Sequence, residues 1–365
     1  MQAPFYRSGA PVRAFVHAGM NLAMQPRVRP VRMDRREFCR IMVGCTVVGC
    51  AGGLAGCARL LEWSAQDTGE GRTAEMAERS TEATPTVEAT VAPEPAPPPP
   101  DLAVFRGEDP AANTRAAVLA LGGMERFVKR GARVAIKPNI VTGREPQFAT
   151  STNPDALAEV VRMALEAGAA SVIVFDRPTG DPYTCYQVSG IQAAVEAAGG
   201  SMKVLTDRNF ERFEIPNARA LPSWPLVTDV FEVDTFINMP IAKHHGMAIL
   251  TMAMKNLMGI MGGERGEIHQ EFQHKIVDLA TIVQPHLVIL DAYRIMVRNG
   301  PTGGSLDDVE TPKTVIAGTN MPAVDAYGTT LFGMQPTDLD YLRNAAERGL
   351  GIIDLAALRI LEGTA

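Results

Sequence analysis

Short apolar runs rich in β-branched residues alternate with longer segments of helical periodicity over residues 101–365. Each run is short and continuously apolar, which predicts a buried strand. Asn153 followed by Pro154 predicts the start of one connecting helix, with Asn153 as its N-cap. Buried strands separated by helices predict one α/β domain over residues 101–365, with a mainly parallel sheet and helices on both faces. The predicted strands cover residues 133–137, 171–175, 202–205, 235–238, 286–290 and 314–317.

Polar side chains stand at the ends of most of these predicted strands. In an open parallel sheet, ligands bind beyond the carboxyl ends of the strands, so residues there are candidates for a site. Turn formation alone also explains an Asn or Asp at any single strand end. A lysine at such an end is harder to explain, because lysine is a poor turn former. The candidate ligand-binding residues are Lys137, Asn139, Asn238 and Asp291, and Asp176 is a candidate catalytic group.

The stretch from residue 238 to residue 269 holds three of the six histidines of the chain and two of its lysines. A lysine in an apolar, methionine-rich setting has a lowered pKa and can act as a nucleophile or base. An asparagine offers both a donor and an acceptor to a substrate oxygen. The alternative to a functional site is that the methionines of this stretch form a stripe of the hydrophobic core and its glycines form an ordinary loop. The predicted catalytic residues are Lys243, Lys255 and Asn256, and His245 and His269 are predicted metal ligands or acid–base groups.

The first 57 residues predict an export signal. Arg35-Arg36 precedes an apolar run over residues 41–56 that is rich in glycine and alanine. The run is shorter than the ~20 residues of a membrane-spanning helix and fits a signal peptide, although a short membrane helix or uncleaved anchor is the alternative. Twin arginines before a weakly apolar run resemble a twin-arginine (Tat) signal. The closing Leu54-Ala55-Gly56-Cys57 resembles a lipoprotein processing box, which predicts a lipid on Cys57.

Residues 58–100 predict a disordered tether. Seven prolines fall among residues 62–100, and the rest of that stretch is mostly alanine, threonine and glutamate. Such a composition cannot bury enough apolar surface to fold. Met33 is the predicted true start, because it gives the signal an ordinary length. The sequence therefore predicts an extracytoplasmic, membrane-anchored lipoprotein that has the Tat machinery and the membrane as partners. A soluble periplasmic or secreted protein is the alternative.

Charge and cysteine content exclude two classes of protein. The net charge of −6 divides into +7 for residues 1–61 (nine bases, two acids), −6 for 62–100 (two bases, eight acids) and −7 for 101–365 (24 bases, 31 acids). An acidic body lacks the basic face that nucleic-acid binding needs. Cys185 is the only cysteine after residue 100, so the body predicts neither a disulfide framework nor an iron–sulfur cluster of its own.

Several motifs of the body resemble the domain of unknown function 362 family. The resemblance runs from about residue 134 to residue 351, and the Lys-Asn-Leu-Met-Gly segment at 255–259 is its most specific part. The activity of that family is not established. Many members carry an appended iron–sulfur segment, so electron transfer by this chain would need a separate redox partner. The motifs are Lys137-Pro138-Asn139, Ser151-Thr152-Asn153-Pro154, Asp176, Ser189-Gly190, Asn238-Met239-Pro240, Lys243, His244, Lys255-Asn256-Leu257-Met258-Gly259, His269, Gly300-Pro301 and Val324-Asp325-Ala326.

Three residues are also similar to a pattern of the nickel-pincer lactate racemase superfamily. In that superfamily a His, a Lys about ten residues later and a His about fifteen further hold a nickel pincer nucleotide, to which the Lys is bonded. Here His245, Lys255 and His269 have spacings of 10 and 14. The resemblance implies a metal ion or a nickel-pincer-like cofactor, with Lys255 as the covalent site.

Two hypotheses about function follow. The first is an exported enzyme, dependent on a metal or cofactor, that acts on a small anionic substrate with Lys255 as nucleophile. The second is a lipid-anchored binding protein in which Lys137, Lys243 and Lys255 clamp a small anion without turnover. Both predict a small-molecule ligand, and neither predicts nucleic acid as a partner.

Overall fold

The computed structural model describes residues 98–365. The predicted signal region with its lipidation site Cys57, and most of the tether predicted for residues 58–100, lie outside the described residues. The division of the chain into signal, tether and domain therefore stays a prediction.

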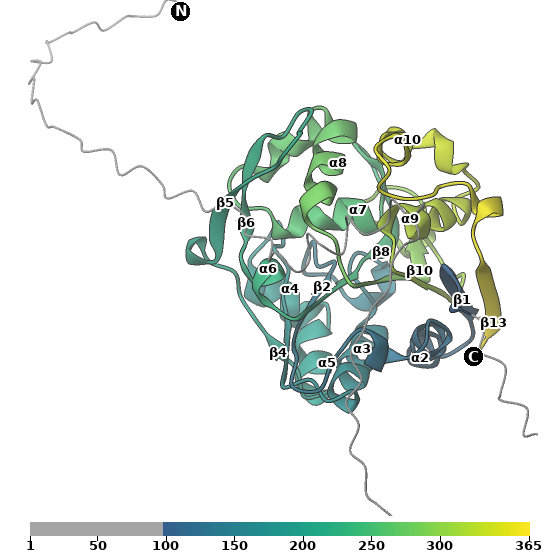
Figure 1. The fold of residues 1–365 in the computed structure, drawn as a ribbon. Coiled ribbons are helices and arrows are strands. Elements are labelled where there is room, and N and C mark those ends of the chain that lie inside the picture. Colours follow the sequence, from purple (N-terminus) through teal and green to yellow (C-terminus); the bar gives the residue numbers. More distant parts are fainter. Residues whose placement is uncertain (1–97) are drawn as a thin grey trace, which may run out of the picture. The chain divides into compact units, whose positions relative to one another are not determined.

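A sheet of eleven strands forms the centre of the described part of the chain (Figure 1). Eight strands follow the order β13-β1-β12-β10-β7-β2-β3-β4, and β8, β9 and β11 are paired beside this path. All neighbours from β10 to β4 are parallel, whereas β12 runs antiparallel to β1 and β10, so the prediction of a mainly parallel sheet is confirmed. The strands are β1 (Leu102–Arg106), β2 (Arg133–Pro138), β3 (Ser171–Val174), β4 (Ser201–Met202), β7 (Thr235–Met239), β8 (Ile241–His245), β9 (Ile249–Thr251), β10 (Leu287–Met296), β11 (Val309–Glu310), β12 (Thr314–Gly318) and β13 (Ile360–Thr364).

Five of the six predicted strands are present, as β2, β3, β7, β10 and β12, whereas the strand predicted for residues 202–205 is wrong in its bounds, because β4 covers only Ser201–Met202. The sequence pattern gave no sign of β8, which carries a lysine and two histidines. It forms because its backbone pairs with β10 on one side and with β9 on the other. A separate two-stranded sheet, β5 (Phe210–Glu214) with β6 (Ser223–Val227), was also not predicted.

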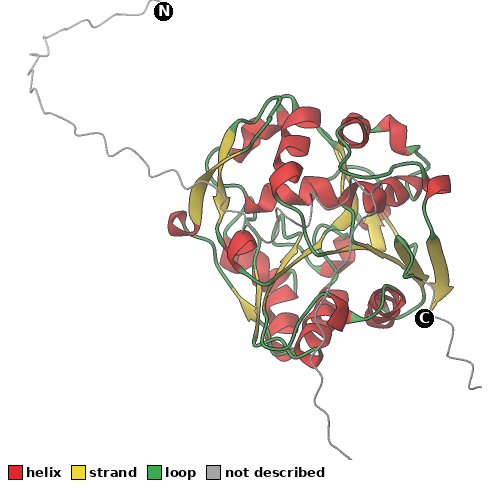
Figure 2. Ribbon diagram, in the orientation of Figure 1, coloured by secondary structure: helices red, strands yellow, loops and turns green. Residues whose placement is uncertain are grey.

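Helices cover both faces of the sheet, as predicted (Figures 1 and 2). Side chains alternate along a strand, so Val134 and Ile136 of β2 pack on one face and Ala135 packs on the other. Helices α2, α3, α4 and α5 pack on the face that carries Val134 and Ile136. Helices α7, α8, α9 and α10 pack on the face that carries Ala135. Burying each aliphatic side chain of this kind stabilises the fold by roughly 1.5–3 kcal/mol. The helices are α2 (Pro110–Ala120), α3 (Pro154–Glu166), α4 (Pro182–Val188), α5 (Ile191–Ala197), α6 (Asp229–Glu232), α7 (Ala253–Asn256), α8 (Phe272–Ile282), α9 (Met321–Thr330) and α10 (Asp340–Glu347).

The predicted helix start at Asn153 is confirmed. Oδ1 of Asn153 accepts a hydrogen bond from the N–H of Asp155 at 2.9 Å, and Pro154 is the first residue of α3. Among residues 98–365, no helix is both long and apolar enough to span a membrane. Single 3-10 turns connect the longer elements: η1 (Met124–Arg126), η2 (Pro146–Phe148), η3 (Asp207–Asn209), η4 (Leu257–Ile260), η5 (Arg265–His269), η6 (Leu306–Asp308), η7 (Pro336–Asp338) and η8 (Leu355–Ala357).

Candidate functional site

A cavity of about 250 Å³ lies beyond the carboxyl ends of β2 and β3, with β8, α7 and η5 completing its wall. This is the edge where an open parallel sheet binds its ligands. Asn238 and Lys243 lie behind the wall, and Asp291 is placed elsewhere on β10. The predicted site residues that line the cavity are Lys137, Asn139, Asp176, His245, Lys255, Asn256 and His269.

A buried ion pair forms the floor of this region. Lys137 lies at the end of β2 and Asp176 follows β3, so the parallel pairing of the two strands brings them together. Nζ of Lys137 is 2.9 Å from Oδ1 of Asp176, and Oδ2 of Asp176 accepts the N–H of Ile140 at 2.6 Å. Burial lowers the pKa of Lys137, and the carboxylate of Asp176 opposes that shift. The carboxylate is thus committed to partners within the protein.

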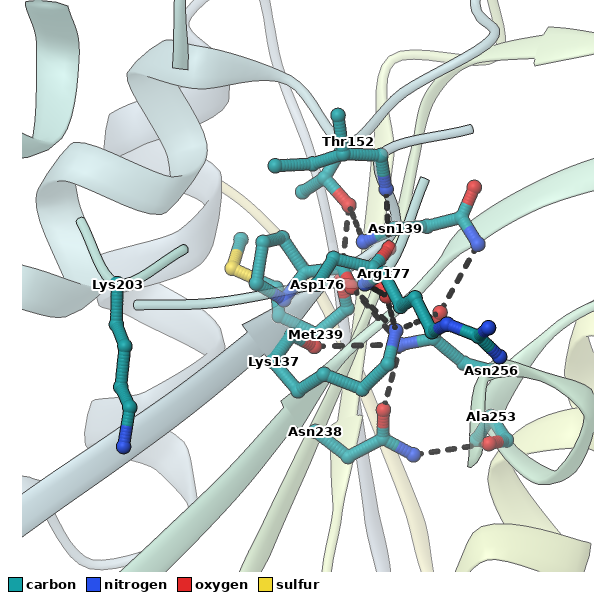
Figure 3. A network of polar contacts seen from close by, with 12 residues as sticks. Lys137, Asn139, Thr152, Asp176, Arg177, Lys203, Asn238, Met239, Ala253 and Asn256 are labelled. Carbon is teal, nitrogen blue, oxygen red and sulfur yellow. Dashed lines mark hydrogen bonds and ion pairs between the residues drawn. The ribbon is translucent and has the colours of Figure 1, made fainter. Parts of the chain in front are cut away.

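Asn256 is the centre of a buried hydrogen-bond network (Figure 3). Its Oδ1 accepts from Nζ of Lys137 at 2.8 Å and from Nδ2 of Asn139 at 3.0 Å. Its Nδ2 donates to Oδ1 of Asn238 at 2.8 Å, and Asn238 donates to the carbonyl of Ala253 at the start of α7. The strands thus fix the helix that carries Lys255. We call Lys137, Asn139, Asp176, Asn238, Lys243 and Asn256 the strand-end network.

Lys243 supports this network from behind. Its side chain is fully buried on β8, and its Nζ donates to Oδ1 of Asn139 at 2.8 Å and to the carbonyl of Thr150. Burial lowers the pKa of Lys243 well below its usual value, and the neighbouring Lys255 adds to the shift. In this position Lys243 orients Asn139, while its predicted catalytic role stays a prediction.

Gly259 closes the family-like segment at 255–259 and permits the buried ion pair. A Cβ built on Gly259 would overlap the carboxylate of Asp176 and would lie 2.5 Å from Nζ of Lys137. Any side chain would therefore displace the pair. The φ angle of Gly259 is not in the left-handed region, so its backbone conformation does not require glycine. What requires glycine here is the close approach of the backbone to the ion pair.

Lys255 differs from the other two lysines of the site. It is 8% exposed and lines the cavity, and its Nζ lies 3.7 Å from Sδ of Met258 and 6.0 Å from the ring centre of Phe272. No oxygen atom among residues 98–365 hydrogen-bonds or ion-pairs with this Nζ. Burial lowers the pKa of Lys255 to about 7, and the charges of Arg265 and Lys137 add to the shift. A large share of its side chain is therefore a neutral amine near pH 7.

His245 and His269 stack with their ring centres 5.3 Å apart and their planes 13° from parallel. Nδ1 of His245 accepts two backbone N–H groups at 3.2 Å, which places its ring hydrogen on Nε2. Nδ1 of His269 lies 3.1 Å from the carbonyl of Gly266, so its hydrogen is on Nδ1 and its Nε2 lone pair is bare. Burial lowers the pKa of His245 to about 3, with Lys255 adding to the shift, and burial also lowers the pKa of His269. We assign both rings as neutral.

Four polar side chains that line the cavity were not among the predicted site residues: Arg177, Thr179, Thr251 and Arg265. The side chain of Arg265, the first residue of η5, forms no hydrogen bond or ion pair with any residue in the range 98–365. Burial lowers its pKa, while Asp176 opposes the shift. Oγ1 of Thr251 and Nε2 of His269 are buried and have no hydrogen-bond partner among the described residues. We call Thr251, Lys255, Arg265 and His269 the open wall.

Two aspartates outside the cavity hold its walls in place. Asp325 of α9 accepts the N–H groups of Ala253 at 2.6 Å and of Met254 at 3.0 Å, which fixes the first turn of α7. Burial raises the pKa of Asp325 to about 7. Asp291 accepts the N–H of Asn153 at 2.7 Å and that of Tyr293 at 3.0 Å, so its carboxylate supports the loop before α3. Its predicted ligand contact stays a prediction.

The donor atoms bear on the predicted metal. Within residues 98–365, no three His, Cys, Asp or Glu side chains come together in a way that could hold a metal ion. The stacked pair offers one bare imidazole lone pair, Nε2 of His269, because His245 carries its hydrogen on Nε2. One free lone pair is too few to bind a metal ion, so the described residues do not form a metal site by themselves. Ligation by His245 and His269 stays a prediction.

Comparison with known proteins identifies the family. The model of the domain of unknown function (DUF362) matches residues 134–330, which is more than half of the chain. The chain belongs to this family. The resemblance seen in the sequence is thereby confirmed. A thylakoid-associated protein of Synechocystis sp. is 28% identical to this family member over 260 residues, covering 67% of this chain and 76% of the relative.

Two solved structures are similar to this DUF362 protein. The lactate racemase apoprotein of Thermoanaerobacterium thermosaccharolyticum has a TM-score of 0.38 at 13% identity, covering 60% of this chain and 53% of that one. A protein of Thermotoga maritima has a TM-score of 0.36 at 12% identity, covering 51% of each chain. This chain thus spans about half the length of both. At these TM-scores the likeness extends to neither a cofactor nor a reaction.

Proposed function

We propose that the described domain is an enzyme that binds a small anionic substrate and uses the amine of Lys255 as its nucleophile or base. The observation that carries the proposal is the placement of this side chain. Lys255 is buried in the wall of the cavity without an oxygen partner, and its pKa is about 7. A lysine in this state can attack an electrophile or remove a proton near neutral pH.

The charges around the cavity support an anionic substrate. Four cationic side chains line the cavity, Lys137, Arg177, Lys255 and Arg265, beside one carboxylate, that of Asp176, which is paired with Lys137. An uncompensated buried charge is costly, and an anion that enters the cavity would lower that cost. The overall charge of −7 on residues 101–365 makes this cationic wall a local exception.

The neighbouring groups support proton transfer beside Lys255. The bare Nε2 of His269 can accept a proton, and Oγ1 of Thr251 can donate a hydrogen bond to a substrate oxygen. We propose that the strand-end network acts on Lys255 from behind, by fixing α7. In this proposal Lys243, Asp176 and Asn256 are positioning residues.

We also propose that the chain is exported by the Tat machinery and anchored to the membrane by a lipid on Cys57. The support is in the sequence alone: Arg35-Arg36, the apolar run at 41–56 and the closing Leu-Ala-Gly-Cys57. Replacing Arg35 and Arg36 by lysine would stop export, and Cys57→Ala would release exported protein from membranes. Exported Cys57→Ala protein that stays in the membrane pellet would exclude the lipid anchor. A wild-type protein found free outside the cytoplasm would favour the soluble alternative.

The function test begins with full-chain protein matured in its own host. Intact mass and metal content decide whether Lys255 carries a cofactor, as the resemblance to the nickel-pincer superfamily implies. A thermal-shift screen of small carboxylates and phosphates then finds ligands, and each ligand is followed for turnover by NMR. We expect turnover that Lys255→Met abolishes and that the exposed control Lys129→Met preserves. Tight binding without turnover would replace the enzyme by the tethered binding protein.

A further inference from the structure

The open wall holds four polar groups that the protein leaves for a ligand to satisfy. These groups are Nζ of Lys255, the guanidinium of Arg265, Nε2 of His269 and Oγ1 of Thr251. Within residues 98–365, none of these atoms has a hydrogen-bond or ion-pair partner, apart from the sulfur of Met258 beside Lys255. Oγ1 of Thr251 and Nε2 of His269 are buried without a partner, Lys255 is a buried residue, and Arg265 is half-buried. Buried polar groups almost always find partners in native structures, so this group of side chains around one cavity indicates a ligand site.

Arg265 indicates one end of that molecule. A guanidinium presents a planar fork of donors, which matches the two oxygens of a carboxylate better than it matches a single charge. Arg265, Lys255 and His269 line the same cavity. A carboxylate held by Arg265 therefore places the adjoining atoms of the ligand beside the amine of Lys255.

Lys255 indicates what those adjoining atoms are. Its amine is flanked by Met258 and Phe272, which offer no competing hydrogen bond to an oxygen. Such a lysine is suited to form a Schiff base with a carbonyl group. We infer that the cavity takes a small 2-oxo acid, whose carboxylate binds Arg265 and whose carbonyl carbon bonds to Nζ of Lys255 as an iminium. This inference rests on the proposed function of Lys255.

The proposed step needs only Lys255 and His269, both of which line the cavity, and the 2-oxo acid. Nε2 of His269 first takes a proton from the Lys255 ammonium, and the freed nitrogen lone pair forms the C–N bond while the carbonyl π pair moves to oxygen. A proton passes from nitrogen to that oxygen and gives a carbinolamine. His269 returns its proton to the hydroxyl, the C–O bond breaks, and water leaves. The sum is ammonium plus ketone giving iminium plus water, with no change of oxidation state and no further reactant.

Reductive trapping of full-chain protein tests the inference. Pyruvate is the probe, acetone replaces its carboxylate by a methyl group, and lactate lacks its ketone. With sodium cyanoborohydride present, we expect one N-carboxyethyl adduct per chain, mapped by peptide mass to Lys255. We expect acetone to label at least about tenfold more slowly, given the strength of charge-assisted hydrogen bonds. Lactate should give no adduct and should slow labelling by pyruvate.

Two variants locate the selectivity. Arg265→Gln should lower the ratio of the pyruvate labelling rate to the acetone labelling rate at any one pH, because both rates depend equally on the fraction of neutral amine and only pyruvate carries the carboxylate. Lys255→Met should remove the adduct, whereas Lys129→Met should keep it. Adducts spread over surface lysines, or equal labelling of Lys255 by acetone and pyruvate, would overturn the inference. If Lys255-dependent turnover of another anion is found without trapping, the inference fails while the proposed function stands.

Discussion

The strand-end network and the open wall differ in whether their polar side chains have partners within the protein. In the strand-end network, Lys137 is bonded to Asp176 and Asn256, and Lys243 is bonded to Asn139. In the open wall, Lys255 and Arg265 have no oxygen partner among the described residues. All three lysines have lowered pKa values because of burial, so burial alone does not separate them. What separates them is whether the fold supplies an acceptor.

This difference predicts different roles for the two groups of residues: structural support for the strand-end network, and ligand binding or catalysis for the open wall. A satisfied buried network fixes one arrangement, and removing one of its members leaves another without a partner. A buried group without a partner lowers stability, so its presence at a cavity marks a place where a ligand completes the site. Substitutions in the strand-end network should therefore lower the free energy of unfolding, and substitutions in the open wall should lower activity.

The largest expected effect is on activity, at Lys255. Lys255→Met removes the amine but fills the same volume with an unbranched apolar chain, so the rate should fall on the order of a thousandfold or more. The free energy of unfolding should stay the same or rise, because no oxygen loses a hydrogen bond. Steady-state kinetics and urea denaturation measure the two. A variant with full activity, or one that unfolds much more readily than Lys129→Met, would break the comparison.

The next effect is on stability, at Lys137. Lys137→Met leaves the buried carboxylate of Asp176 without its cation, which should cost about 3–5 kcal/mol of the free energy of unfolding. The double variant with Asp176→Asn removes that charge, and we expect it to recover part of the loss. Urea denaturation of the single and double variants gives the coupling between the two residues. A single variant as stable as wild type would show that the strand-end network is not structural support.

A smaller loss is expected at Gly259. Gly259→Ala places a methyl group against Lys137 and Asp176, and overpacking of this kind costs about 1–3 kcal/mol. The matched control is Gly304→Ala, whose added Cβ would meet nothing within 4 Å and whose φ is not in the left-handed region. Thermal unfolding of both variants measures the difference. Equal melting temperatures would contradict the close approach that we assign to Gly259.

Sequence patterns predicted the sheet because burial of continuous β-branched runs is a local property. The strand ends then brought Lys137, Asn139 and Asp176 to one edge, as parallel topology requires. The pattern could not show Arg265, because a charged residue in a glycine-rich loop is usually solvated, and only packing makes this one line a cavity. Likewise, Asp325 lies about 70 residues from the helix it holds, and only the tertiary fold brings them together.

The smallest expected effect is on the pH dependence of the Lys255 amine. Its pKa of about 7 arises from burial and from the charges of Arg265 and Lys137. The other titratable groups of this region are Asp176, which is paired with Lys137, and Lys243, His245 and His269. Reactivity toward a neutral aryl fluoride should rise about tenfold per pH unit below pH 6 and level off above pH 8, because only the amine reacts.

Arg265→Gln sharpens the comparison in the same assay. Without the guanidinium, the ammonium form of Lys255 is less disfavoured, so the pKa rises and the inflection moves to higher pH. Lys129→Met should leave the inflection in place. The linked stability has a definite sign: between pH 7 and the ordinary lysine pKa the unfolded chain binds more protons, so the contribution of Lys255 to stability increases with pH. An inflection that moves to lower pH in Arg265→Gln would remove Arg265 from the surroundings of the amine, and with it the electrostatic basis of the open wall.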